Sequence, residues 1–356
     1  MGGAAIKAAV LVCGALAVTA PGAQEKIKLT VASGQPPRIM PSMANVPDTF
    51  IPEVNRRIKA AGLKYEIEWK EAYAGSLLKP TQVVDGIRDG TADIAMIPAG
   101  LFPDKLPLEQ VTFAVPFLTP DVGLLSRVLD RLHATMPEFP AQYDKLNQVR
   151  LGGTGVDSYE LLTTFPVRRI EDIQGKKIAT AGAATIWLRG TGATPVSSNI
   201  MEYYNSTKTG VYDGFITVAS SFSGMKLPEA APYVTRVGFG AQYAVVLTMN
   251  RDSYRKMPES LRKILGEAGA AWGLASDKGQ VAAGNANLQN LASFKAQLYE
   301  LPRAEQVRWA KSMPNIAREW AERMDKQGLP GSKALGVLMA EARKAGATPV
   351  RDWDKE

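Results

Sequence analysis

The stretch Val83–Ile94, VVDGIRDGTADI, predicts how one half of this chain folds. Apolar residues at its start share one face of a helix. Gly90 ends that helix, because glycine readily adopts the left-handed conformation that closes a helix. Asp93 follows three residues later, and an apolar strand begins at Ile94. The chain therefore passes directly from a helix into a buried strand, which is typical of α/β proteins.

The same pattern returns further along, in Tyr203–Val218, YYNSTKTGVYDGFITV. Here Gly210 ends the helix, Asp213 again follows three residues later, and the apolar strand begins at Phe215. Two such elements predict two lobes of similar build with a cleft between them, where small ligands usually bind.

The segments around the first element complete an α/β lobe. They predict a strand at Ile27–Ala32 that stops at the turn cluster Ser33–Pro37, a helix carrying Phe50, Val54 and Ile58 on one face, and a second strand at Tyr65–Trp69. We expect the first lobe to comprise residues 24–153 and about 237–272, and the second lobe residues 154–236 and about 273–356.

Two later stretches are helical by pattern. From Pro258 to Gln297 there is no proline, and apolar residues keep one helical face, although five glycines in this stretch count against one unbroken helix. A second helical stretch, Arg303–Lys326, follows Pro302 and precedes Gly328.

Composition excludes most kinds of catalytic and metal site. The chain has 356 residues, a formal net charge of +7, one cysteine (Cys13) and one histidine (His133). Zinc sites built from Cys and His, disulfide frameworks and Cys–His nucleophile pairs are therefore excluded. A Ser–His–Asp triad would need His133, for which we expect a surface or packing role. We predict no catalytic residue, no metal and no cofactor, and the absence of long runs of like charge argues against nucleic acid as a partner.

The N-terminus has the pattern of an export signal. Lys7 precedes an apolar run, Ala8–Ala20, that is too short to span a bilayer as a mature helix. We predict that residues 1–23 are a signal peptide, with cleavage after Ala20 or Ala23, and that the mature protein works in the periplasm.

Four stretches of the mature chain resemble one family. They are Gly75-Ser76-Leu77 with Val83–Ile94, Val115-Pro116-Phe117-Leu118, Ile170–Ile178, and Gly192–Val196 followed by Glu202-Tyr203 and Gly210–Gly214. In this order and spacing they resemble the substrate-binding subunits of tripartite ATP-independent periplasmic (TRAP) transporters. The resemblance implies a two-lobed periplasmic binding protein fold, with a long helix crossing both lobes. It also implies capture of a small organic acid or related solute, delivered to the small and large subunits of a sodium-coupled membrane permease.

One departure from the family concerns the ligand. Family members usually have an arginine after the Lys-Ile of Lys177-Ile178, where its guanidinium holds the ligand carboxylate, and here that position is Ala179. Either another cation replaces it, with Arg38 the first candidate, or neutral hydrogen bonds and apolar surface hold the solute. Tyr159 and Trp187 would suit a bulkier, partly apolar or aromatic solute with at most one acid group.

The resemblance thus predicts a set of ligand-binding positions rather than a catalytic centre. These are Gln35, Arg38, Ser76, Tyr159, Ala179, Thr180, Trp187, Asn199, Ile200 and Thr217. The alternatives to a solute-binding protein are an exported enzyme acting on a small substrate and a basic surface protein that binds polyanions.

Overall fold

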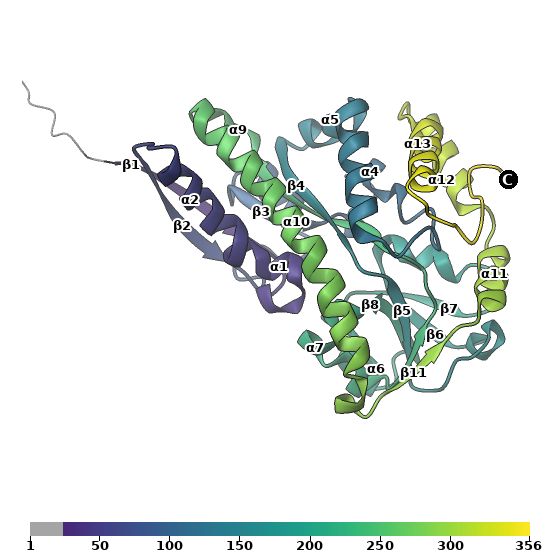
Figure 1. Ribbon diagram of the computed structural model, residues 1–356. Helices are drawn as coiled ribbons and strands as arrows, with labels where there is room; N and C mark the ends of the chain where they lie inside the picture. The colour runs from purple at the N-terminus through teal and green to yellow at the C-terminus, as the bar shows by residue number, and fades with distance from the viewer. Residues whose placement is uncertain (1–23) are drawn as a thin grey trace, which may run out of the picture.

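The structure, a computed structural model, describes residues 24–356. The predicted signal peptide, residues 1–23, lies outside the described residues. Two mixed β-sheets form the framework, and one long helix runs beside both of them (Figure 1). Among the helices of residues 24–356, none has both the length and the apolar character needed to cross a membrane.

The first sheet has five strands in the order β2-β1-β3-β10-β4. The strands are β1 (Glu25–Ala32), β2 (Tyr65–Ala72), β3 (Ile94–Pro98), β4 (Gln148–Val156) and β10 (Gln242–Asn250). Parallel pairing joins β1 to β2 and β3, and antiparallel pairing joins β10 to β3 and β4. The helices that accompany this sheet are α1 (Pro41–Asn45), α2 (Ile51–Ala60), α3 (Val83–Arg88), α4 (Val122–Thr135), α5 (Glu138–Lys145) and α9 (Arg251–Lys256).

The second sheet has six strands in the order β11-β9-β5-β8-β6-β7. They are β5 (Tyr159–Thr163), β6 (Lys177–Ala181), β7 (Thr194–Ser198), β8 (Gly214–Val218), β9 (Tyr233–Arg236) and β11 (Gln297–Glu300). Its helices are α6 (Tyr203–Lys208), α7 (Phe222–Met225), α8 (Leu227–Ala230) and α11 (Arg303–Ser312). The predicted α/β class, the strands β1 and β2, and both helix–Gly–Asp–strand elements are confirmed, with Gly90 and Gly210 at φ values of 73° and 74°.

Short 3₁₀ turns link these elements. They are η1 (Pro37–Ile39), η3 (Ala99–Leu101), η4 (Leu108–Val111), η5 (Ile170–Ile173), η6 (Gly182–Leu188), η7 (Ala219–Ser221) and η8 (Leu291–Phe294), and a π turn, η2 (Val46–Phe50), leads into α2. The segment around Trp187 is η6, the longest of these 3₁₀ elements within residues 24–356.

The long helix is α10 (Glu259–Gln289), and it contacts β4, α1 and α2 of the first lobe as well as η7 of the second. The helix is unbroken, although it contains five glycines. Several of these glycines lie where another element packs so closely that a Cβ would not fit. A Cβ on Gly273 would lie 2.5 Å from the carbonyl oxygen of Gly153 in β4. One on Gly279 would lie 2.8 Å from Cβ of Pro41, and one on Gly284 would lie 2.5 Å from the carboxylate of Asp157. The helix stops at Gln289, short of the predicted Gln297, and the chain then forms η8 and β11.

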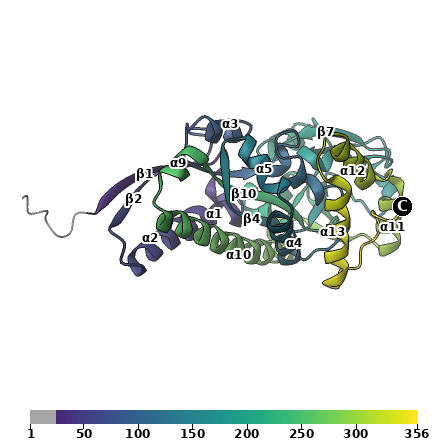
Figure 2. The ribbon, with the colours of Figure 1, turned by 90° about the horizontal axis from the view of Figure 1, so that it is seen from above.

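The C-terminal segment differs from the expected single helix. Helices α11 and α12 (Ile316–Lys326) are separate, because Pro314 interrupts the pattern and Asn315 caps α12 by accepting a 2.9 Å hydrogen bond from the N–H of Arg318. Helices α12 and α13 (Gly331–Lys344) pack against α4 and η4, which belong to the predicted first lobe. Seen from above, they lie at the end of the molecule opposite the tips of β1 and β2 (Figure 2). The lobe boundaries themselves remain a prediction.

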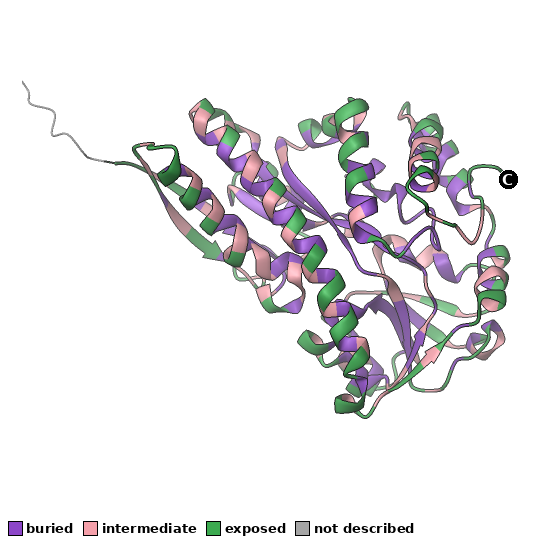
Figure 3. Ribbon diagram, in the orientation of Figure 1, coloured by how far each residue is buried: buried purple, intermediate pink, exposed green. Residues whose placement is uncertain are grey.

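The core follows the sheets. The strands β3, β8 and β10 are buried over nearly their whole length, whereas exposed residues lie on the outer faces of the helices and at the tips of β1 and β2 (Figure 3). Two chain segments and α10 connect the lobes: residues 157–158 join β4 to β5, and residues 237–241 join β9 to β10.

Candidate functional site

A cavity of about 80 Å³ lies between the two sheets. Its walls come from the ends of β3, β6 and β8, from β4, β5 and β10, and from the segments that follow β1 and β7. Ligands of open α/β sheets usually bind outside the carboxyl ends of the strands, which is where β3, β6 and β8 reach this cavity. The lining residues are Gln35, Met40, Met43, Pro98, Gly100, Leu101, Phe113, Val156, Tyr159, Ala181, Asn199, Ile200, Tyr203, Ile216, Thr217, Val218, Ala244 and Val245.

Half of the predicted ligand-binding residues line this cavity. They are Gln35, Tyr159, Asn199, Ile200 and Thr217. Gln35 comes from the turn after β1, Tyr159 begins β5, and Thr217 lies near the end of β8. These segments are far apart in the sequence, so the fold brings them together as the resemblance implied. Ligand contact by each of them remains a prediction.

The other predicted residues lie outside the cavity lining. Arg38 and Ser76 are exposed, and Ala179 is fully buried within β6. Thr180 is buried, and its hydroxyl donates to Oγ1 of Thr185 at 2.8 Å. In β6 it is Ala181, two residues beyond Ala179, that lines the cavity.

Trp187 lies behind the cavity wall. Its ring is fully buried, stacked on Phe113 on one side (5.8 Å between centroids) and on Phe239 on the other (5.1 Å). It also meets Tyr159 edge-on at 5.3 Å, and its Nε1 donates to the carbonyl oxygen of Phe113 at 2.7 Å. Because Phe113 and Tyr159 both line the cavity, Trp187 fixes the aromatic part of the wall.

Sequence reasoning missed most of the apolar lining. Met40, Met43, Leu101, Phe113 and Tyr203 were not predicted, although all five contribute to the cavity. Apolar residues in a strand or helix pattern give no sign of whether they face a core or a cavity. Only the general rule that ligands bind near the carboxyl ends of strands could have pointed to Leu101, which follows β3.

The cavity offers hydrogen bonds without charge. The side chain of Gln35 is buried, and its Oε1 has no hydrogen-bond partner within residues 24–356. The Oδ1 of Asn199 accepts a 3.0 Å bond from the N–H of Met201, which orients its amide. Burial raises the pKa of the Tyr159 hydroxyl, with a smaller contribution from Asp157, so the hydroxyl stays neutral.

The two lobes touch beside the cavity. Gly182 of η6 packs so closely on the carbonyl of Gly100 in η3 that a Cβ would collide with it. Gly224 of α7 lies against η1, where a Cβ would be 2.8 Å from the carbonyl oxygen of Arg38. The two lobes are therefore in direct contact beside the cavity in this structure.

The connecting segments are tied to each other by polar groups. The N–H of Gly238 donates to the carboxyl of Glu160 at 3.1 Å, and the N–H of Gly240 donates to Oγ of Ser158 at 3.2 Å. Asp157 accepts a 2.9 Å bond from the N–H of Ser220 in the second lobe. Burial raises the pKa of Asp157 and of Glu160 to about 7 in each case, and the hydrogen bonds only partly offset it.

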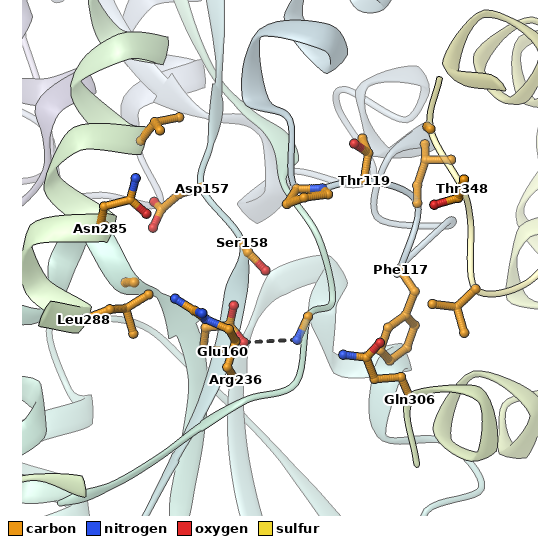
Figure 4. Close-up of a pocket in the computed structure, with 18 of the residues that line it drawn as sticks. Phe117, Thr119, Asp157, Ser158, Glu160, Arg236, Asn285, Leu288, Gln306 and Thr348 are labelled. Carbon is orange, nitrogen blue, oxygen red and sulfur yellow. Dashed lines mark hydrogen bonds between the residues drawn. The ribbon is translucent and has the colours of Figure 1, made fainter. Parts of the chain in front are cut away.

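A larger hollow, of about 530 Å³, lies beside these connections, between α10, α11 and the C-terminal segment (Figure 4). Asp157, Ser158, Glu160 and Arg236 form its middle, and Thr119 and Thr348 lie on its far side. It is larger than the cavity, but none of the predicted ligand-binding residues lines it, although Ser158, Glu160 and Ala219, which directly follows β8, do. We therefore take the smaller cavity as the candidate ligand site.

The single histidine, His133, packs inside the first lobe. Nε2 of His133 lies 2.8 Å from the carboxylate of Glu109, and both side chains are almost fully buried in the first lobe. Burial alone would raise the pKa of Glu109, but the charges of His133 and Arg150 and the hydrogen bonds from His133 and Tyr143 together outweigh burial and lower this pKa. The predicted packing role of His133 agrees with this position. Within residues 24–356, no group of three or more His, Cys, Asp or Glu side chains is arranged to hold a metal ion.

Residues 62–323 match the sequence model of the bacterial extracellular solute-binding proteins of family 7. The chain belongs to this family. The chain is similar to the protein YiiZ of Salmonella typhimurium, 25% identical over 243 residues, and to a solute-binding protein of Sulfitobacter sp. strain NAS-14.1, 28% identical over 172 residues. These matches cover 64% and 46% of this chain, and 70% and 52% of the two relatives.

Solved structures of TRAP solute-binding proteins share the fold. One from Rhodoferax ferrireducens, in complex with copurified benzoate, has a TM-score of 0.78 at 22% identity, covering 89% of this chain and 98% of that one. One from a marine metagenome, specific for aromatic acid ligands, has a TM-score of 0.77 at 22% identity, covering 90% and 99%. A Bordetella pertussis receptor that binds pyroglutamic acid has a TM-score of 0.76 at 19% identity, covering 89% and 99%. The family 7 chain described here therefore has the two-lobed fold of periplasmic binding proteins.

Proposed function

We propose that this chain is the solute receptor of a TRAP transporter, working in the periplasm after removal of residues 1–23. It captures one small organic solute in the cavity between its lobes and delivers it to the small and large membrane subunits of the permease. The observation that carries the proposal is the cavity itself, enclosed by residues from both sheets at the place where the lobes touch. Membership of family 7 supports the same role.

The cavity wall favours a receptor over the alternative of an exported enzyme. Its lining within residues 24–356 holds no Asp, Glu, His, Lys, Arg or Cys, so no ordinary general acid, general base or thiol faces a bound molecule. Two tyrosines are its only titratable groups, and burial raises the pKa of each. Such a wall binds a molecule without altering it.

The first test is recovery of the natural solute. Protein purified from an exporting cell is denatured, and the released small molecule is identified by mass spectrometry. Adding this molecule back to emptied protein is expected to raise the melting temperature and leave the molecule unchanged. Conversion to a product would support the enzyme instead.

A pair of variants locates the binding. Ala181→Phe places a ring in the cavity, whereas Leu298→Phe enlarges an exposed side chain on β11 away from it. We expect Ala181→Phe to abolish the thermal shift and Leu298→Phe to keep it. Small-angle scattering of the wild-type protein is expected to show a smaller radius with solute, as hinge closure requires.

Delivery is tested with the membrane subunits. Vesicles that contain the permease pair are expected to accumulate the solute only when the wild-type chain and a sodium gradient are both present. The Ala181→Phe chain serves as the control in the same assay.

A further inference from the structure

No lining side chain of the cavity carries a charge at neutral pH. Among residues 24–356, the wall contains no lysine, arginine, histidine or carboxylate. Its two titratable groups, Tyr159 and Tyr203, are buried, and burial raises the pKa of each hydroxyl, so both stay neutral.

Neighbouring segments bring no cation to the wall either. Arg38 is exposed on η1, and that turn meets the second lobe through its backbone carbonyls, which face Gly224. Ala179 has no polar side chain. Trp187, in the following η6 segment, has a single hydrogen-bond donor, Nε1, which donates to the carbonyl oxygen of Phe113. The space behind the wall is filled by the stacked rings of Phe113, Trp187 and Phe239.

Neutral polar groups, in contrast, remain free to bind a solute. Oε1 of Gln35 is buried without a partner, and the hydroxyls of Tyr159 and Thr217 make no hydrogen bond within residues 24–356. The amide nitrogen of Asn199 is likewise free, because only its oxygen is engaged, by the N–H of Met201. Tyr159, Asn199 and Thr217 belong to the second lobe, and Gln35 belongs to the first. The other side chains that the first lobe contributes to the cavity are apolar.

We infer that the cavity recognises a compact, largely apolar solute through one polar head group, held by neutral hydrogen bonds and by no ion pair. Gln35, Tyr159, Asn199 and Thr217 would hold the head group, while Met40, Met43, Leu101 and Phe113 pack on the apolar body. A second acid group would be buried against apolar surface without a partner, which is costly enough to exclude dicarboxylates. The inference rests on the proposed receptor function and specifies its solute.

The test compares variants and matched probes by calorimetric titration. The probes are the solute recovered from the purified protein, its primary amide or other uncharged analogue where it is an acid, and succinate. We expect the recovered solute to carry at most one acid group, its uncharged analogue to bind within about tenfold of it, and succinate not to bind at millimolar concentration. A dicarboxylate as the natural solute, or an uncharged analogue that binds more than a hundredfold more weakly than the acid, would overturn the inference.

Single substitutions separate neutral from ionic recognition. Arg38→Ala is expected to leave the dissociation constant within twofold, whereas Tyr159→Phe and Gln35→Leu are each expected to weaken binding about tenfold. A hundredfold loss in Arg38→Ala would show an ion pair and overturn the inference, while leaving the receptor function intact. If the emptied wild-type protein is stabilised by no recovered or added solute, the receptor function fails, and this inference fails with it.

Discussion

The two sheets share the same strand order and pairing directions. The first sheet, β2-β1-β3-β10-β4, and the second, taken as β7-β6-β8-β5-β9, place parallel and antiparallel neighbours in the same order. Asp93 and Asp213 hold equivalent places in the two plans. Each carboxylate accepts a 2.8 Å bond from a neighbouring strand, from the N–H of Thr30 in one lobe and of Lys177 in the other.

The lobes differ in what they bring to the cavity. From the first lobe come Met40, Met43, Leu101, Phe113 and other apolar groups, with Gln35 as its one polar side chain. From the second come two tyrosines, Asn199 and Thr217, together with apolar residues such as Ile200 and Ile216. The same strand order thus supports one nearly apolar wall and one mixed wall, so the sheets position the cavity, and the loops and strand ends decide its chemistry.

The largest expected effect comes from the residue that joins the two walls. Trp187 of the second lobe stacks on Phe113 of the first and meets Tyr159 of the second. Trp187→Ala is expected to lower the free energy of unfolding by about 3–5 kcal/mol, as for other fully buried aromatic residues, and to weaken solute binding as well. Chemical denaturation and titration measure the two effects.

A matched control separates packing from wall position. Trp353 is also fully buried, and its Nε1 donates to the carbonyl oxygen of Pro116 at 2.9 Å; neither residue lines the cavity. Trp353→Ala is expected to cost similar stability without changing which solutes bind. If the alanine variant does not fold, Trp187→Phe is used instead, which removes the indole hydrogen bond and part of the ring but keeps an aromatic group in place. Unchanged affinity in both Trp187 variants would contradict its role in the wall.

The next effect concerns Asp157, in one of the two segments that connect the lobes. Burial raises the pKa of Asp157 to about 7 in the folded chain, whereas an unfolded aspartate titrates near 4. The unfolded chain therefore loses this proton first, and the group's contribution to stability falls as the pH rises from about 4 to about 7. Asp157→Asn removes that term and is expected to raise the free energy of unfolding at pH 8 by on the order of 2 to 4 kcal/mol.

The pH dependence supplies its own controls. Glu160 has the same raised pKa and lies beside Asp157, so Glu160→Gln is expected to act in the same direction. Asp104 is exposed, and Asp104→Asn is expected to change nothing. Melting temperatures from pH 4.5 to 8 decide the matter. A slope of stability against pH that is the same in Asp157→Asn and the wild type would refute the assignment.

A smaller effect tests whether the repeated aspartates are equivalent. The carboxylate of Asp93 accepts a second bond, 2.6 Å, from the hydroxyl of Ser253, and Asp213 has no such side-chain partner within residues 24–356. Asp93→Ala is therefore expected to cost about 2–3 kcal/mol and Asp213→Ala about 1–2 kcal/mol in denaturant unfolding. Equal losses would mean that the extra bond of the first lobe adds nothing.

Much of the repeated plan could be predicted from the sequence. Gly90 and Gly210 adopt the left-handed backbone conformation that ends a helix, and an aspartate follows each of them three residues later. Each pattern lies within a few residues, so the sequence alone reveals it. The break between α11 and α12 at Pro314 was equally local and was overlooked. The continuity of α10 was harder to predict, because the glycines that count against a helix are there for neighbours such as Gly153 and Asp157, far away in the sequence.

The site was predictable only in part, for the same reason. Gln35, Asn199 and Thr217 were predicted from the resemblance and line the cavity, whereas Met43 and Phe113 resemble core residues in any sequence pattern. Of the two alternatives for the missing arginine, the cavity lining favours neutral hydrogen bonds over another cation, because it contains no lysine or arginine within residues 24–356. Whether Arg38 faces the cavity depends on how η1 packs on α7, which no local pattern specifies.

The smallest expected effect tests closure itself, and it uses glycine at the contact between the lobes. Gly224 of the second lobe meets η1 of the first, and a Cβ there would lie 2.8 Å from the carbonyl oxygen of Arg38 and 2.9 Å from that of Ile39. Alanine at this position fits the separated lobes but not the closed ones, so Gly224→Ala is expected to weaken solute binding about tenfold, equivalent to about 1.4 kcal/mol. Gly266 in α10 is the matched control, because a Cβ there would meet nothing within 4 Å, and alanine in a helix interior is expected to add about 0.5–1 kcal/mol of stability. Titration of the two variants with the same solute measures the difference, and small-angle scattering should show a larger radius for Gly224→Ala at a solute concentration that closes the wild type. If Gly224→Ala bound as tightly as Gly266→Ala, the contact between α7 and η1 would not be part of the bound state, and closure would depend on the other contacts between the lobes, such as Gly182 on Gly100 and Trp187 on Phe113.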